Sequence, residues 1–177
     1  MYKGKRIIVI TGGYNEEGKI GKVIERIPKF VDFIFVVDDG SKDNTYKEIV
    51  KARANNVVRN KKNKGAGNVL KKGIRYAIKN NYDIVVIIGG DNQDNPKEIK
   101  KLVLPIAKGN YDLVLGSRFI KKKEVVKIPL ARKLALILYN KLFNFVIKKY
   151  KVTDASNGFK AFKTSILKNI SLIIWVI

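Results

Sequence analysis

The sequence predicts an α/β fold with a mostly parallel sheet and helices on both faces. Short runs of apolar, largely β-branched residues alternate with segments of helical periodicity. Glycine, acidic and amide residues follow directly after several of these runs, as is typical of the carboxyl ends of parallel strands. The 177 residues, 46% hydrophobic and 29% charged, are enough for one well-filled core, so we expect a single domain over residues 1–177.

Three strand–helix pairs are expected in the first half of the chain. The strands are predicted at Arg6–Thr11, Phe33–Val37 and around Val57–Val58. Asn15 is expected to cap the first helix, whose apolar residues have helical spacing, and Pro28 is expected to end it. The second helix should begin at Ser41 or Asp43, and the third should follow the glycine-rich segment 63–67.

The second half continues the alternation. Its strands and helices are expected at Ile84–Ile88, Pro96–Ala107, Asp112–Leu115, Leu130–Lys149, within Asp154–Phe162, and from Thr164 onward. The helix at Leu130–Lys149 has a broad apolar face with basic side chains elsewhere. Such a helix packs on its own sheet more often than it lies in a membrane interface, and both alternatives stay open.

Composition excludes several kinds of chemistry. The chain contains neither cysteine nor histidine, which rules out disulfides, thiolate or histidine metal sites, and Ser-His or Cys-His nucleophiles. The formal net charge of +22 favours an anionic partner, such as a phosphorylated substrate, an anionic lipid or a nucleic acid. No nucleic-acid-binding motif accompanies the lysines, so that partner is the least expected. With no signal peptide or membrane span apparent, we expect a cytoplasmic protein, peripheral on the cytoplasmic membrane face if it binds one.

Acidic and amide side chains follow the strand at Ile84–Ile88. Asp91 and Gln93 are two residues apart, and Asp94 adds another oxygen before Pro96 opens the next helix. Hard oxygen ligands of this kind suit Mg²⁺ or Mn²⁺, which usually keeps positions for water and substrate phosphate. The alternative is a polar turn that only caps the following helix.

The order of these polar segments resembles family 2 glycosyltransferases of the GT-A fold, nearest to dolichyl-phosphate mannose or glucose synthases. The matching segments are YNEE (14–17), VVDDGSKDNT (36–45), NKGAGNVLKKG (63–73), Asp91–Gln93 with Pro96, GSRF (116–119) and DASNGFKAF (154–162). The resemblance covers roughly residues 6–168 and implies binding of a nucleotide sugar. The positions that it implies for the nucleotide are Gly12, Tyr14, Glu16, Val37, Asp39 and Gly90.

The resemblance also implies roles in transfer. Asp91 and Gln93 match residues that hold a divalent metal on the donor diphosphate, while Arg118 and Arg132 match residues that hold the phosphate of the acceptor. Surface charge is the alternative for the two arginines. A polyprenyl phosphate acceptor is already anionic, so it would displace the nucleotide directly, with inversion and without a strong base. A hydroxyl acceptor would need a base, and Asp154 is the candidate if its role is not structural.

Two departures from the family pattern shape the expectation. Gly89 stands where the first acidic residue of the metal motif is usual, and Asn95 stands where aspartate is common. The family also usually continues beyond this length, so we expect the C-terminal part of its domain to lie outside this chain. The sequence therefore predicts a glycosyltransferase using a donor such as GDP-mannose or UDP-glucose. The alternative is a nucleotide-sugar-binding relic with weak or no turnover.

Overall fold

The computed structural model describes residues 1–120, 129–148 and 152–166. Its elements are β1 (Ile7–Gly13), α1 (Ile20–Glu25), β2 (Phe33–Asp38), α2 (Thr45–Lys51), β3 (Asn56–Arg59), α3 (Ala66–Lys79), β4 (Ile84–Ile87), η1 (Pro96–Glu98), α4 (Ile99–Ala107), β5 (Leu113–Leu115), α6 (Leu130–Ile147) and β6 (Lys160–Lys163). The chain forms two compact units. Of the described residues, one unit comprises 1–114 and 159–166, and the other comprises 115–120, 129–148 and 152–158.

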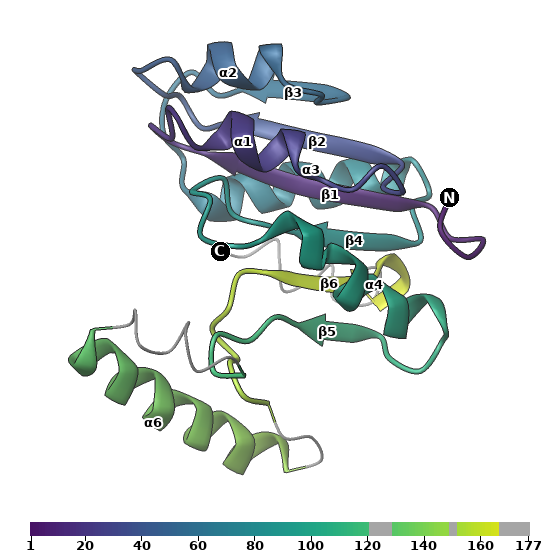
Figure 1. The fold of residues 1–177 in the computed structure, drawn as a ribbon, viewed down its shortest axis with the longest axis vertical. Coiled ribbons are helices and arrows are strands. Elements are labelled where there is room, and N and C mark those ends of the chain that lie inside the picture. The colour runs from purple at the N-terminus through teal and green to yellow at the C-terminus, as the bar shows by residue number, and fades with distance from the viewer. Residues whose placement is uncertain (121–128, 149–151, 167–177) are drawn as a thin grey trace. The chain divides into compact units, whose positions relative to one another are not determined.

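The sheet has the order β3-β2-β1-β4-β6-β5 (Figure 1). β1 pairs in parallel with both β2 and β4, and β2 pairs in parallel with β3. β6 runs antiparallel to β4 and lies between β4 and β5. The carboxyl ends of β1 to β4 therefore share one edge of the sheet, which confirms the mostly parallel α/β prediction.

Both faces of the sheet are covered by helices because the central strands are apolar on both sides. In β1, Ile7 and Val9 belong to the cluster packed by α1, α2 and α4, whereas Ile8 and Ile10 belong to the cluster packed by α3. All four side chains are fully buried. This period-two alternation places the core on either side of the sheet.

The first helix starts later than the sequence predicts. α1 begins at Ile20, and its N-cap residue is Lys19 rather than Asn15. Asn15 instead adopts a left-handed conformation with φ of 56° and accepts a hydrogen bond from the Lys42 amide at 2.9 Å. Asparagine tolerates this conformation, and a long-range bond replaces the expected local cap.

The second unit contains α6, which is tied to the segment after it by two asparagines. Asn144 exchanges hydrogen bonds with the backbone of Val152, accepting from its amide and donating to its carbonyl at 2.7 Å each. Asn140 donates to the Thr153 carbonyl and accepts from the Ala155 amide. These bonds fix residues 152–155 against the helix.

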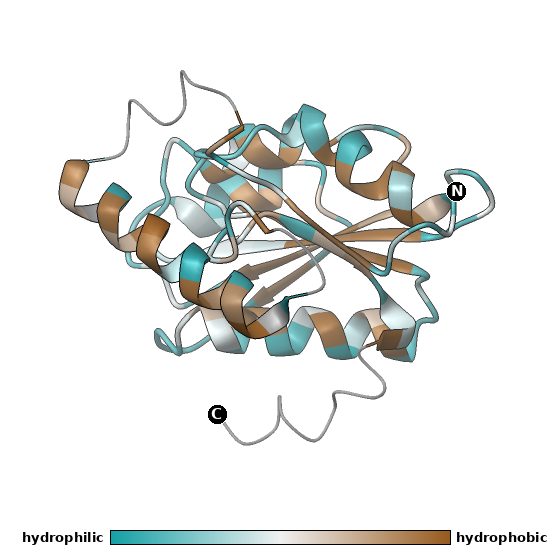
Figure 2. Cartoon of the chain, turned by 90° about the horizontal axis from the view of Figure 1, so that it is seen from below, coloured by the Kyte–Doolittle hydropathy of each residue, from teal (hydrophilic) through white to brown (hydrophobic). Residues whose placement is uncertain are grey.

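Apolar side chains on α6 are exposed. Leu134, Leu138 and Leu142 are 58–60% exposed, and Phe145 and Val146 more so. Figure 2 shows brown apolar segments recurring along this helix. Among the described residues, no helix is both long and apolar enough to cross a membrane.

Candidate functional site

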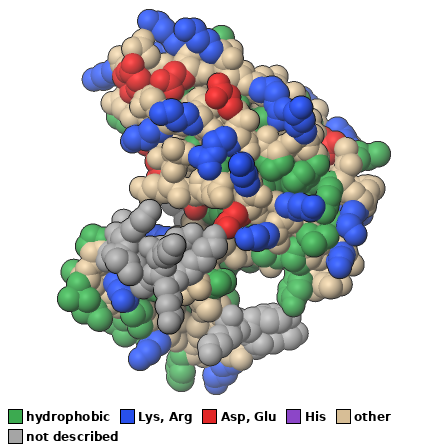
Figure 3. Space-filling model, in the orientation of Figure 1, with side chains coloured by type: hydrophobic (Ala, Val, Ile, Leu, Met, Phe, Trp, Pro, Cys, Tyr) green, Lys and Arg blue, Asp and Glu red, His purple; other side chains and the backbone are tan. Residues whose placement is uncertain are grey.

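A basic cleft lies at the carboxyl edge of the sheet. Its volume is about 770 Å³, and the loops after β1, β2 and β3 form its walls. The lining residues are Tyr14, Gly40, Ser41, Lys42, Arg59, Asn60, Lys61, Lys62 and Asn63. Four of them carry a positive charge, which suits a phosphate-bearing ligand. Figure 3 shows lysine and arginine side chains spread widely over one face of the molecule, so positive charge is not confined to the cleft.

The loop after β1 is bonded to the segment that follows β2. The Asn15 amide donates to Ser41 Oγ at 3.0 Å, and the Glu16 amide donates to Thr45 Oγ1 at 2.7 Å. Gly18 donates to Glu48 of α2. These bonds hold Tyr14, which is 36% exposed, at the cleft wall.

Asp39 anchors the glycine-rich segment rather than facing open solvent. Its carboxylate is 2% exposed and accepts hydrogen bonds from the backbone amides of Lys64 and Gly65, at 2.8–3.1 Å. It also accepts from the Asn60 side chain, which in turn accepts from Lys72 of α3. Through these bonds Asp39 holds Asn60, which lines the cleft, and the two residues just before α3.

Three predicted nucleotide-binding residues meet where β1, β2 and β4 end. Gly12 is paired with Val37 in the sheet, and a Cβ at Gly12 would lie 2.3 Å from the Val37 carbonyl oxygen. A Cβ at Gly90 would lie 2.8 Å from the Gly12 carbonyl oxygen and 2.4 Å from Ile20. Val37 itself is fully buried, and it pairs with Gly12 of β1 on one side and with Val58 of β3 on the other. Only glycine permits such close backbone packing at positions 12 and 90.

Asp91 and Gln93 lie in the segment after β4, at the same edge of the sheet. Asp91 Oδ1 accepts a hydrogen bond from the Gln93 amide at 3.1 Å, and Asn92 between them has φ of 60°. A Cβ at Gly89 would lie 3.0 Å from Asp91 Oδ1, so a carboxylate there would stand beside that of Asp91. Within the described ranges, no three acidic side chains cluster as a metal site. One carboxylate and one amide oxygen nevertheless fit a Mg²⁺ or Mn²⁺ ion that takes its other ligands from a diphosphate and water.

A charged pair adjoins Asp91. Lys19 Nζ lies 2.9 Å from Glu16 Oε2. The hydrogen bond and charge of Glu16, with a smaller contribution from Asp91, raise the pKa of Lys19 above its ordinary value. The charge of Lys19, the N-cap residue of α1, therefore interacts with both Glu16 and Asp91.

In the second unit, Arg118 and Asp154 form a two-pronged ion pair. Arg118 Nε and Nη2 donate to the two oxygens of Asp154 at 2.8 and 2.9 Å, and the Arg118 amide donates as well. The Asp154 side chain is fully buried. Burial works to raise the pKa of Asp154, but the hydrogen bonds and charge of Arg118 outweigh it and hold the pKa below its usual range. A carboxylate so held is a weak base and a good positioning group.

Several residues that organise these segments had no signal in the sequence. Arg26, near the end of α1, donates to Asn92 and Asn95, and Asn60 bridges Asp39 to α3. Each contact joins segments distant in the chain, which local patterns do not reveal. Arg132 lies in the first turn of α6, and its side chain lies outside the described part of the structure.

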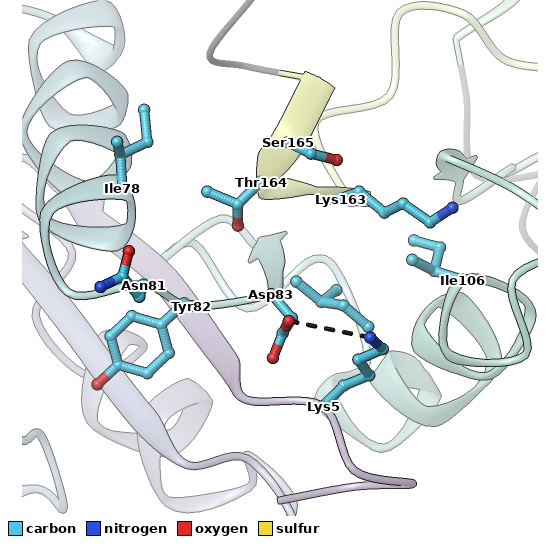
Figure 4. Close-up of a pocket in the computed structure, with 10 residues that line it drawn as sticks. Lys5, Ile78, Asn81, Tyr82, Asp83, Ile106, Lys163, Thr164 and Ser165 are labelled. Atoms are coloured by element: carbon cyan, nitrogen blue, oxygen red, sulfur yellow. Dashed lines mark ion pairs between the residues drawn. The ribbon is translucent and has the colours of Figure 1, made fainter.

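Another pocket, of about 270 Å³, lies at the opposite edge of the sheet, where β4 begins (Figure 4). Lys5, Asp83 and Lys163 line it, and Lys5 lies 4.0 Å from Asp83. Thr164 Oγ1 has no hydrogen-bond partner among the described atoms and is directed toward this pocket. None of the predicted site residues lines it.

Comparison with known proteins decides the family. The model for glycosyl transferase family 2 matches residues 7–171. The chain belongs to this family. Its sheet, with the cleft at the carboxyl edge, is the GT-A fold of its structural neighbours.

Two relatives of the chain carry names that state an activity. UDP-N-acetylglucosamine–dolichyl-phosphate N-acetylglucosaminyltransferase of Methanococcus voltae is 34% identical over 94% of this chain and 73% of its own length. Dolichol-phosphate mannosyltransferase of Pyrococcus furiosus is 28% identical over 94% of this chain and 49% of its own length.

A solved structure is similar to this chain as well. Glucosyl-3-phosphoglycerate synthase from Mycobacterium tuberculosis, in complex with Mn²⁺, UDP and glucosyl-3-phosphoglycerate, superimposes with a TM-score of 0.65 and 27% identity. The match covers 93% of this chain and 58% of that structure. The chain thus spans less than two thirds of the solved protein.

Proposed function

We propose that this chain transfers a sugar from a nucleotide sugar to a polyprenyl phosphate. The basic cleft at the carboxyl edge of the sheet carries the proposal, because Tyr14 lines it and the buried Asp39 holds another lining residue, Asn60. The two relatives named above, a dolichyl-phosphate N-acetylglucosaminyltransferase and a dolichol-phosphate mannosyltransferase, support this acceptor class. Mannose, glucose and N-acetylglucosamine donors are the candidates.

The donor is proposed to bind with its nucleotide in the cleft and its diphosphate toward the segment after β4. Asp91 and Gln93 would hold Mg²⁺ or Mn²⁺ there, and the ion would neutralise charge on the departing diphosphate. The lysines that line the cleft add positive charge for the same group.

The acceptor phosphate is proposed to attack the anomeric carbon of the sugar directly. A bond forms between a phosphate oxygen and that carbon, while the carbon–oxygen bond to the nucleoside diphosphate breaks and leaves its electron pair on the diphosphate. No proton moves, which agrees with a chain that lacks histidine and holds Asp154 as a weak base. Arg118 and Arg132 would bind the acceptor phosphate, with Asp154 fixing the guanidinium plane of Arg118.

A transfer assay tests this proposal. The protein is incubated with dolichyl phosphate, Mn²⁺ or Mg²⁺, and radiolabelled GDP-mannose, UDP-glucose or UDP-N-acetylglucosamine in turn. We expect label in the lipid phase with one donor, lost on chelation and reduced at least about 10-fold by Asp91→Asn. Asp112→Asn is the matched control, because Asp112 is an exposed residue just before β5. No lipid-linked label with any donor and metal would refute transfer.

Gly89 favours a second candidate, a protein that binds nucleotide sugars without turnover. The missing carboxylate leaves the metal with fewer protein ligands. In that case calorimetry detects binding of UDP or GDP, while the transfer assay detects no label in the lipid phase. Gly89→Asp, whose Cβ fits beside Asp91 after a shift of a few tenths of an ångström, would then restore transfer. Activity in the wild-type protein rules this candidate out.

A further inference from the structure

Arg26 joins the end of α1 to the segment after β4. Its Nη1 donates to Asn92 Oδ1 at 3.1 Å, and its Nη2 donates to Asn95 Oδ1 at 3.0 Å. The two acceptors lie 66 and 69 residues away in the sequence. A guanidinium is a rigid planar fork, so the two bonds fix the two asparagines relative to each other.

The bonded asparagines bracket the candidate metal ligands. Asn92 lies between Asp91 and Gln93 and has a left-handed φ of 60°, a conformation that its neighbours must hold. Asn95 also accepts from the Lys97 amide and so caps the turn at η1. Arg26 therefore bonds to the segment that carries the candidate ligands at two points. One is Asn92, between the two ligands, and the other is Asn95, the N-cap of η1.

We propose that Arg26 is the positioning residue that holds Asp91 and Gln93 in the geometry needed for the metal and the donor diphosphate. The inference rests on the proposed function, because it assigns a role within the same site. The described hydrogen bonds of Arg26 go to Asn92 and Asn95 and not to the ligands, so Arg26 acts through these two asparagines. Partners that orient ligands in this way commonly change metal affinity 10- to 100-fold when removed.

Three variants separate this role from a general effect on folding. Arg26→Gln removes the charged fork. Arg26→Lys keeps the charge but cannot reach both asparagines with planar geometry. Arg53→Gln is the matched control, because Arg53 also lies just after a helix and donates one bond, to the Ile27 carbonyl at 3.2 Å, away from the ligand segment.

The first measurement is hydrogen exchange of the metal-free protein. We expect Arg26→Gln to speed exchange about 10-fold or more in residues 91–97, where the Gln93 and Lys97 amides bond to Asp91 and Asn95, and to leave β1 and β2 unchanged. Arg53→Gln should leave residues 91–97 unchanged. Equal exchange of this segment in wild type and Arg26→Gln would overturn the inference.

The second measurement is a Mn²⁺ titration with two readouts. Electron paramagnetic resonance with UDP or GDP present reports Mn²⁺ binding, and the transfer assay reports activity. We expect Arg26→Gln and Arg26→Lys to raise the half-saturating Mn²⁺ concentration about 10-fold, with transfer recovering at high Mn²⁺. An unchanged Mn²⁺ requirement in an active enzyme overturns the inference and leaves the proposed function standing. If the wild type neither binds Mn²⁺ nor transfers sugar, the proposed function fails, and the metal-site role of Arg26 fails with it.

Discussion

At the scale of single residues, Asp154 shows how one side chain serves structure before chemistry. It is fully buried, and both of its oxygens accept from Arg118. A buried carboxylate is tolerated only when it is paired and hydrogen-bonded, and here both conditions are met. The ion pair links Arg118 to Asp154 within the second unit. Its loss should therefore lower the free energy of unfolding.

We expect Asp154→Asn to lower the free energy of unfolding by about 2 kcal/mol at pH 7. Removing one partner of a buried pair costs about 3–5 kcal/mol, and the partial exposure of Arg118 to water reduces that figure. Urea denaturation measures the difference. Asp112→Asn is the control, because its pair with Lys163 is largely exposed and should be worth less than about 1 kcal/mol.

The same difference should depend on pH. Because the folded pKa of Asp154 lies below its unfolded value, the stabilisation is fully present above the unfolded pKa of about 4 and is lost as pH falls through the folded pKa. The gap between wild type and Asp154→Asn should therefore stay constant from pH 7 to about 5 and shrink below about 4. A gap that is unchanged at low pH would contradict the assigned ion pair.

At the scale of elements, the contact of α3 with β1 depends on a glycine. A Cβ at Gly73 would lie 2.4 Å from Ile10 Cγ2, whereas a Cβ at Gly67, also in α3, would meet nothing within 4 Å. Gly73→Ala should cost about 1–2 kcal/mol net of the helix propensity gained, because the fully buried Ile10 must move. Gly67→Ala should be neutral or stabilising by about 0.5 kcal/mol. Thermal unfolding distinguishes the two variants. Equal shifts in melting temperature would contradict the close contact between α3 and β1.

Elements were predictable where local chemistry alone determines them. The β-branched runs at 7–10 and 84–87 form strands, and Gly65 precedes α3 as expected. The predicted start of α1 was wrong, because Asn15 bonds to Lys42, 27 residues away, instead of capping the helix. The insertion of β6 between β4 and β5 likewise depends on long-range pairing, which periodicity does not contain. The same reason hides Arg26 and Asn60 from the sequence.

At the scale of the whole molecule, two properties bear on the proposed lipid-linked acceptor. The formal net charge is +22, and α6 exposes several large apolar side chains. An exposed apolar helix face on a strongly basic protein suits the interface of an anionic membrane, where the apolar side chains enter the acyl boundary and the lysines meet the headgroups. The two alternatives for the helix predicted at Leu130–Lys149, packing on its own sheet and lying in a membrane interface, therefore differ in the vesicle binding that they predict.

We therefore expect the protein to bind vesicles that contain anionic lipid more tightly than zwitterionic vesicles, with binding weakened by salt. Replacing both Leu134 and Leu138 by glutamate should weaken vesicle binding about 100-fold, since burying two leucines is worth about 3 kcal/mol. Val50→Glu, at a similarly exposed position on α2, should change it little. Co-sedimentation with vesicles measures each case. If binding is weakened by salt but unchanged by the leucine substitutions, the attraction comes from charge alone. The apolar face of α6 would then have a different partner.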